Sequence, residues 1–114
     1  MADLNAKLPI PVATIETIPG RQITEYVGAA FGVIVQSSGV ARGFSGFFKS
    51  IKKGEVAEYT TTISEARRIS VERLVEHAQA MGADAVVGLR FDSSDVGGNA
   101  LSEMVAYGTA VKLA

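Results

Sequence analysis

The stretch that decides the fold class is residues 60–92, TTTISEARRISVERLVEHAQAMGADAVVGLRFD. In its first part, apolar side chains recur at the spacing of a helix with one buried face. Gly82 follows where such a helix ends, since glycine adopts a positive φ without strain. Residues 85–92 then place alternate apolar side chains on one face, as a strand does. The stretch predicts a long helix, beginning near residues 58–62, that leads directly into a strand. The predicted buried stripe of the helix is Ile63, Val71, Leu74, Val75, Ala78 and Met81.

Two residues interrupt the helical pattern. Arg67 falls within the apolar stripe, and Ile69 lies near the polar side. An arginine in this place predicts either an ion pair with an acid of a neighbouring subunit or a guanidinium that extends back to water. The apolar margin at Ile69 predicts packing against something beyond the chain's own sheet.

Residues 23–36 form the longest predicted strand. Small residues dominate one of its faces, which lets another element approach closely, and we expect the strand to curve or break near Gly28 or Gly32. One face carries Ile23, Val27, Ala29, Phe31, Val33 and Val35, interrupted by Glu25, and the other carries Thr24, Tyr26, Gly28, Ala30, Gly32 and Ile34.

The rest of the chain completes an α+β fold. Residues 1–11 predict a flexible lead-in, and residues 12–17 a short strand before the Pro19-Gly20 turn. Residues 101–113 predict a last strand, antiparallel to the strand at 85–92 across the Gly97-Gly98-Asn99 turn. We therefore expect a single domain over residues 12–114. It would have a curved, mainly antiparallel sheet, one long helix packed across it, and a short amphipathic helix.

That short helix is predicted within residues 40–54, where aromatic side chains fall on one helical face beside several lysines. The phenylalanines and lysines of residues 43–53 could contact a membrane surface or a partner's groove. The favoured interpretation is a helix folded over one end of the sheet, with its phenylalanines buried. The apolar face is Phe44, Phe47, Phe48 and Ile51.

Composition removes several classes of function. The 114 residues carry a net charge of −1 and include no cysteine and a single histidine. A general affinity for nucleic acid or for an anionic membrane is not expected from this balance. Disulfides, thiolate metal ligands and thiol catalysis are excluded. No targeting segment or membrane span is recognisable, so we expect a soluble, cytoplasmic protein.

Candidate site residues are few. His77 could be a metal ligand or a proton carrier, but the favoured interpretation is a boundary residue hydrogen-bonded to a backbone group. A transition-metal site needs three or four ligands, and no spacing groups His77 with the acidic residues. Asp92 and Asp95 could offer oxygen ligands to Ca²⁺ or Mg²⁺, although an ordinary acidic turn is favoured. The weak metal candidates are therefore His77, Asp92 and Glu103. No catalytic residue and no cofactor is predicted.

Several segments resemble the YbjQ family of small bacterial and archaeal proteins, whose family label refers to heavy-metal binding. They include Thr-Ile-Pro-Gly-Arg at residues 17–21, Glu-Tyr-Val-Gly at 25–28 and Glu-Ala-Arg at 65–67. Met-Gly-Ala-Asp-Ala-Val-Val-Gly at 81–88 and Gly-Thr-Ala-Val at 108–111 complete the set. The resemblance spans roughly residues 14–113. It implies a β-rich subunit that closes into a homopentameric ring, in a family that is largely uncharacterised.

The pattern of the strands predicts self-association independently of the resemblance. A sheet with apolar side chains on both faces needs a packing layer on each face, and one long helix supplies only one such layer. The small-residue face of residues 23–36 and the margin at Ile69 are the predicted contact surfaces. We expect a non-enzymatic, ring-forming protein that binds a small ligand. The alternatives are a metal-binding protein that uses oxygen ligands and His77, and a small hydrolase or isomerase that uses Asp92 or Glu103 between subunits.

Overall fold

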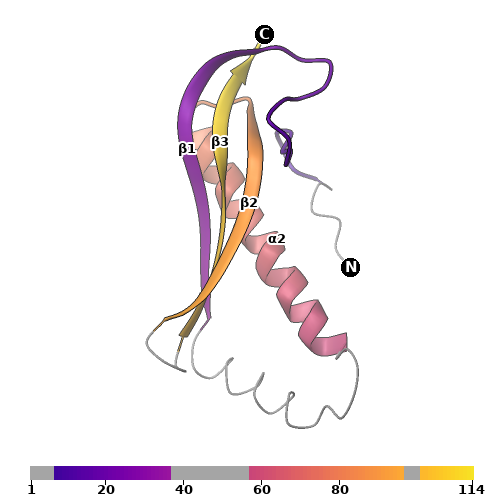
Figure 1. The fold of residues 1–114 in the computed structure, drawn as a ribbon, viewed down its shortest axis with the longest axis vertical. Helices are drawn as coiled ribbons and strands as arrows, with labels where there is room; N and C mark the ends of the chain where they lie inside the picture. Colours follow the sequence, from indigo (N-terminus) through magenta and orange to yellow (C-terminus); the bar gives the residue numbers. More distant parts are fainter. Residues whose placement is uncertain (1–6, 37–56, 97–100) are drawn as a thin grey trace.

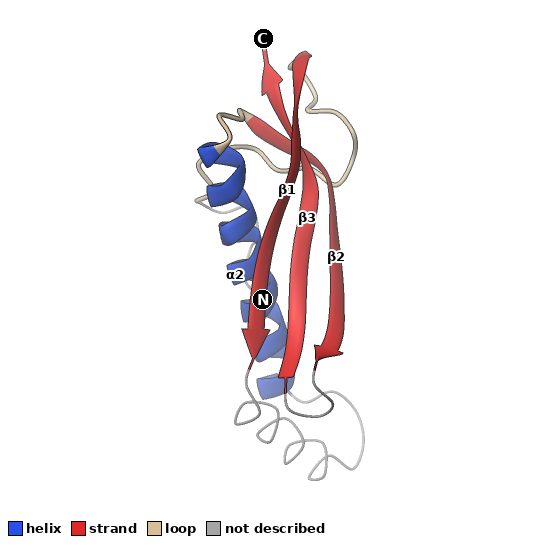
Figure 2. Cartoon of the chain, turned by 90° about the vertical axis from the view of Figure 1, so that its left-hand side faces the viewer, coloured by secondary structure: helices blue, strands red, loops and turns tan. Residues whose placement is uncertain are grey.

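The computed structural model describes residues 7–36, 57–96 and 101–114. Its elements follow the order β1 (Ile23–Gln36), α2 (Ala57–Ala80), β2 (Ala85–Val96) and β3 (Leu101–Leu113). The strands form one antiparallel sheet in the order β1-β3-β2, and α2 lies across one face of it (Figure 1). Figure 2 shows the strands side by side in front of α2.

Most of the predicted architecture is confirmed. The α+β class, the long helix and the antiparallel β2–β3 hairpin are all present. The predicted strand at residues 23–36 has the bounds of β1. The short amphipathic helix expected within residues 40–54 and the glycine turn of the hairpin lie outside the described residues.

The buried face of α2 follows from its helical spacing. Val71, Leu74, Val75 and Ala78 are buried as predicted, whereas Ile63 and Met81 are only half-buried. These side chains pack against the helix-side face of the sheet, mainly on β1 and β3.

The helix ends at Ala80, and Gly82 follows it in the position that terminates a helix. The Gly82 N–H donates to the Gln79 carbonyl at 2.9 Å, and the Ala83 N–H donates to the Ala78 carbonyl at 3.0 Å. Gly82 has a φ of 85°, which completes a Schellman ending.

The small-residue face of β1 lies directly beneath α2. A Cβ atom added to Gly32 would lie 1.9 Å from the Ser70 carbonyl oxygen and 2.3 Å from the Leu74 nitrogen. Ala30, on the same face, is fully buried. The predicted close approach is therefore confirmed, but the element that approaches is the chain's own helix. The prediction that this face contacts a second subunit is wrong, because α2 already covers it.

A β-bulge exchanges the faces of two neighbouring residues in β1. The β1–β3 register shifts between Tyr26 and Gly28. Because an extra residue in one strand reverses the alternation, Val27 packs in the core beneath α2, and Tyr26 lies opposite Val111 on the other face. Simple alternation predicts Val27 on the face of Phe31 and Tyr26 on the face of Gly32, so that prediction is wrong at both residues.

The N-terminal segment runs along the free edge of β2. Val12 bridges Val86, and the Ala13 N–H donates to the Val86 carbonyl at 2.9 Å. The predicted strand at 12–17 is wrong beyond Val12, since residues 14–17 are bends. The expected lead-in at 1–11 lies partly outside the described residues, and within it Leu8 and Ile10 pack against the core beneath α2. Ile18 packs on the opposite face of the sheet. The segment therefore wraps around the β2 edge.

Candidate functional site

By the residues that the structure describes, the face of the sheet away from α2, here the outer face, is covered at one end only. There Ile18, Ile23 and Leu113 pack against a small cluster of buried residues. The remainder of β1 presents large apolar side chains to solvent, and these form what we call the outer stripe. Its members, with their exposed fractions, are Tyr26 at 70%, Phe31 at 50%, Val33 at 39%, Val35 at 51% and Tyr107 of β3 at 38%.

Strand alternation and sheet register produce the outer stripe. Phe31 lies opposite Tyr107, and Val33 lies opposite Val105, so their side chains are neighbours on one face. The members of the stripe are uncharged, but on the same face Arg90 lies opposite Tyr107 and Glu103 lies opposite Val35. An exposed apolar surface bordered by polar and charged residues marks an interaction site.

The free edge of β1 is closed by two side chains of α2. The Phe31 N–H donates to His77 Nδ1 at 3.0 Å, and Arg73 Nη1 donates to the Val33 carbonyl at 2.6 Å. The favoured sequence interpretation of His77, a boundary residue bonded to a backbone group, is therefore confirmed. Because edge strands pair with other chains through such free groups, these bonds disfavour sheet extension at β1.

Replacing His77 with alanine is expected to lower the free energy of unfolding by about 0.5–1 kcal/mol, because water replaces the lost acceptor. Chemical denaturation measures this change. Amide hydrogen exchange at Phe31 is expected to accelerate, since its N–H is then free. The matched control is Glu76→Ala, an exposed neighbour on α2. Equal exchange rates at Phe31 in the two variants would show that His77 does not protect this edge.

The weak metal candidates lie on different elements. His77 belongs to α2 beside the β1 edge, and its Nδ1 is occupied by Phe31. Asp92 lies opposite Val105, and Glu103 lies opposite Ser94, which places both carboxylates on the outer face of β2 and β3. One Asp92 oxygen accepts the Ser93 N–H at 2.9 Å. Within the described ranges, no group of three or more His, Asp or Glu side chains could hold a metal ion.

Arg67 and Ile69, the two residues that interrupt the helical pattern, lie in different surroundings within the chain. The Arg67 guanidinium lies over the Phe91 ring, 5.4 Å from its centroid, which is a cation–π contact. Arg67 is exposed, which agrees with the predicted extension of its guanidinium to water, and the ion pair with a neighbouring subunit stays a prediction. Ile69 is half-buried.

Arg68 pairs with Glu65 at 2.6 Å and with Glu72 at 2.7 Å along the exposed face of α2. The hydrogen bond from Arg68 holds the pKa of the Glu65 carboxyl below its ordinary value, and the same bond raises the pKa of Arg68. Solvent screens exposed pairs of this kind, so they add little to stability.

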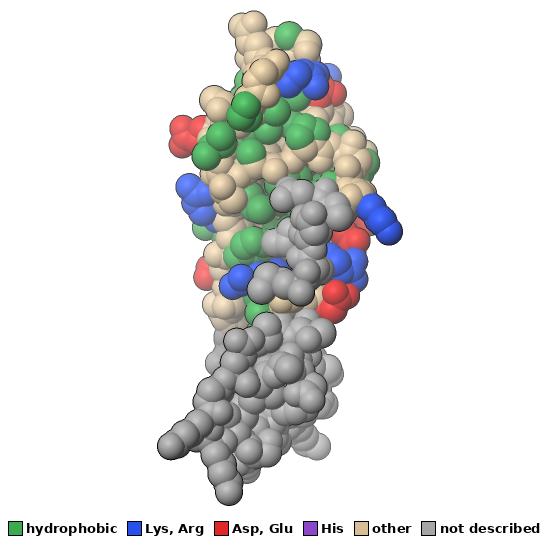
Figure 3. All heavy atoms as spheres, turned by 90° about the vertical axis from the view of Figure 1, so that its right-hand side faces the viewer, with side chains coloured by type: hydrophobic (Ala, Val, Ile, Leu, Met, Phe, Trp, Pro, Cys, Tyr) green, Lys and Arg blue, Asp and Glu red, His purple; other side chains and the backbone are tan. Residues whose placement is uncertain are grey.

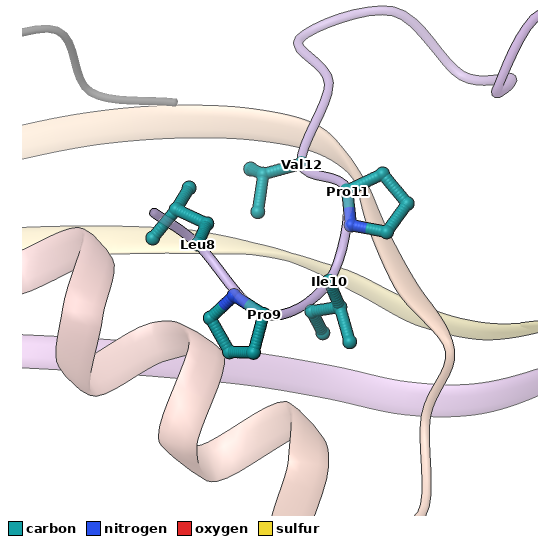
Figure 4. Close-up of a pocket in the computed structure, with 5 residues that line it drawn as sticks. All are labelled: Leu8, Pro9, Ile10, Pro11 and Val12. Atoms are coloured by element: carbon teal, nitrogen blue, oxygen red, sulfur yellow. The ribbon is translucent and has the colours of Figure 1, made fainter. Parts of the chain in front are cut away.

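A second apolar feature lies at the N-terminal segment. Leu8, Pro9, Ile10, Pro11 and Val12 line a pocket of about 300 Å³ (Figure 4). Hydrophobic side chains gather on this side of the molecule, as Figure 3 shows. The sequence prediction missed this pocket, because residues 1–11 were expected to be a flexible lead-in. The available signal was the apolar residues that alternate with the two prolines, Leu8, Ile10 and Val12.

Comparison with known proteins identifies the family. A family model described as "Putative heavy-metal-binding", that of YbjQ, matches residues 10–114. The chain belongs to the YbjQ family. This membership confirms the resemblance drawn from the sequence motifs. In the described part of the chain, no helix is long and apolar enough to cross a membrane.

Relatives of this YbjQ-family chain occur in bacteria and archaea. A "UPF0145 protein" of Vibrio campbellii is 48% identical over 101 residues, which are 89% of this chain and 96% of the relative. One from Pyrococcus furiosus is 47% identical over 102 residues, which are 90% and 89% of the two chains. A crystal structure of a Pediococcus pentosaceus protein of unknown function, of the DUF74 family, aligns with a TM-score of 0.49 and 18% identity. That alignment covers 92% of this chain and 98% of the other.

Proposed function

We propose that this chain is a non-enzymatic, ring-forming protein whose subunits cover one another's outer stripe. The occupant of the stripe is a second copy of the chain. The subunit number implied by the family resemblance is five. A small-ligand site between subunits and a cytoplasmic location are further parts of the proposal.

The observation that carries this proposal is the exposed outer stripe. Phe31 and Val35 are each about half exposed in the isolated subunit, at 50% and 51%. Burying an apolar side chain of this size contributes about 1.5–3 kcal/mol, so leaving several exposed forfeits much of the free energy available to a small domain. The other face of the sheet already has its cover in α2. A second layer on the outer face would complete the packing of the sheet.

A second copy fits the outer stripe better than a charged partner. The charged groups beside the stripe, Arg90 and Glu103, are of opposite sign, so they form no basic patch that would recognise nucleic acid or an anionic membrane. The two α2 side chains that close the β1 edge also favour contact through side chains rather than strand pairing. His77 and Arg73 occupy backbone groups that an added strand would need.

A metal site between subunits is the alternative function. Asp92 and Glu103 share the outer face with the stripe, so an assembly could bring carboxylates of neighbouring chains together. Carboxylate oxygens suit hard cations such as Ca²⁺, Mg²⁺ or Mn²⁺, whereas soft heavy metals prefer the thiolates that this chain lacks. The name of the family model therefore does not fix the metal.

Light scattering coupled to size-exclusion chromatography tests the proposed assembly. We expect a mass that is a multiple of the 11.9 kDa subunit, five for the implied ring. A stable monomer at micromolar concentration would overturn the proposal.

Elemental analysis and titration calorimetry with Ca²⁺, Mg²⁺, Mn²⁺ and Zn²⁺ distinguish the metal alternative. The ring proposal predicts that no metal binds in a stoichiometric amount. It also predicts no heat of metal binding that is lost in Asp92→Asn or Glu103→Gln. Stoichiometric binding that either variant removes would favour the alternative. Screens against acyl, phosphoryl and glycosyl substrates test the non-enzymatic role, and turnover lost in the same two variants would contradict it.

A further inference from the structure

A closed ring of more than two identical subunits needs two different surfaces on each subunit. One surface meets the neighbour on one side, and the other meets the neighbour on the opposite side, so the contact is heterologous. The outer stripe supplies the first surface. Two stripes packed on each other would instead give an isologous dimer, which closes at two subunits. A ring therefore requires a second apolar surface elsewhere on the chain.

Residues 8–15, here the N-terminal arm, provide such a surface. Their sequence, LPIPVATI, contains no charged residue. Ile15 is 55% exposed, and among the described residues it is the exposed large hydrophobic side chain that lies outside the outer stripe. The arm also curves around the pocket of about 300 Å³, so that Leu8 and Val12 both line it (Figure 4). Backbone groups of Pro11 and Ala13 are hydrogen-bonded to β2, so the arm is held against the sheet of its own subunit.

The two surfaces lie at opposite edges of the sheet. The outer stripe belongs chiefly to β1, and the arm follows β2, whose Leu89 N–H donates to the Ala13 carbonyl at 3.0 Å. Because β3 lies between β1 and β2, a subunit presents the stripe on one side and the arm on the other. This placement lets one contact repeat from subunit to subunit in the same direction. Both surfaces expose apolar side chains, so bringing them together would remove apolar area from water on each.

We infer that each ring contact joins the outer stripe of one subunit to the N-terminal arm of the next. Phe31, near the middle of the stripe, is the side chain assigned to the pocket between Leu8 and Val12. This inference rests on the proposed ring and adds the orientation and the partner surface of its contact. It also explains why an apolar pocket lies open at the edge of the sheet farthest from the stripe.

Cysteine cross-linking tests this contact, because the chain contains no cysteine of its own. Val33→Cys marks the stripe and Pro9→Cys marks the arm. A double variant that carries both changes is treated with a short bis-maleimide. We expect a ladder of covalent dimers, trimers and larger species that ends at the ring, and less than a tenth as much product from either single variant. Thr14→Cys serves as a second arm position.

The matched control pairs Val33→Cys with Glu76→Cys on the exposed face of α2, which we expect to give no ladder. Covalent dimers from Val33→Cys alone would show that stripe packs on stripe and would overturn the inference. Assembled protein that gives no ladder with either arm position would overturn it too. If wild-type protein and variants are all monomeric by light scattering, the proposed ring itself fails, which is a separate result.

Discussion

Gly32→Ala is expected to lower the free energy of unfolding by about 3 kcal/mol, at the upper end of the cost of overpacking a core. The added Cβ would lie 1.9 Å from the Ser70 carbonyl oxygen and 2.3 Å from the Leu74 nitrogen, which are backbone atoms of α2. A side chain can rotate away from such a contact, but a helix backbone has to move as a unit. Urea denaturation at a fixed protein concentration measures the loss.

The control for this variant is Gly82→Ala. Gly82 has a positive φ of 85°, but a Cβ there would meet nothing within 4 Å. Its cost is therefore backbone strain alone, about 1 kcal/mol. A loss for Gly32→Ala no greater than that for Gly82→Ala would contradict the close packing of α2 on β1.

Val33→Lys is expected to dissociate the assembly while leaving the subunit folded. Val33 is 39% exposed in the isolated subunit, so lysine can reach water there. Between subunits the same ammonium group would lose its contact with water, which costs about 3–5 kcal/mol when no ion pair replaces it. That range corresponds to a loss of association of roughly 100-fold to several thousand-fold. Sedimentation velocity measures the association, and far-ultraviolet circular dichroism checks the fold.

Ser94→Lys is the matched control, since Ser94 is exposed on the polar β2 side of the same outer face. We expect it to assemble like the wild type. An intact oligomer in Val33→Lys would place the subunit contact elsewhere. Dissociation in both variants would indicate general charge repulsion rather than loss of a specific apolar contact.

Long periodic segments were predictable from the sequence, because local spacing alone determines them. The helix, its glycine ending and the strand 23–36 all follow from apolar spacing and backbone preference. The faces of β1 were harder to assign. The bulge between Tyr26 and Gly28 reverses the alternation; Gly28 indicated an irregularity there, but not which side chains would change face.

The sequence did not predict which element packs against each surface, because these contacts join residues that are far apart in the chain. Gly32 indicated close packing, but only the structure shows that the packed element is α2. The contact of Phe31 with His77 joins residues 46 positions apart. The arm at residues 8–15 pairs with β2 over more than 70 positions, and its prolines resemble those of a loose terminus.

Hydroxyl-radical footprinting of the purified protein, read by mass spectrometry, tests most directly whether a neighbouring subunit covers the outer stripe. Tyr26, Phe31 and Tyr107 are reactive aromatic side chains, and all three are exposed in the isolated subunit. We predict that their modification is suppressed severalfold in the wild type relative to Val33→Lys. Equal, high modification of all three in both proteins would mean that the stripe stays in contact with water, and would contradict the account.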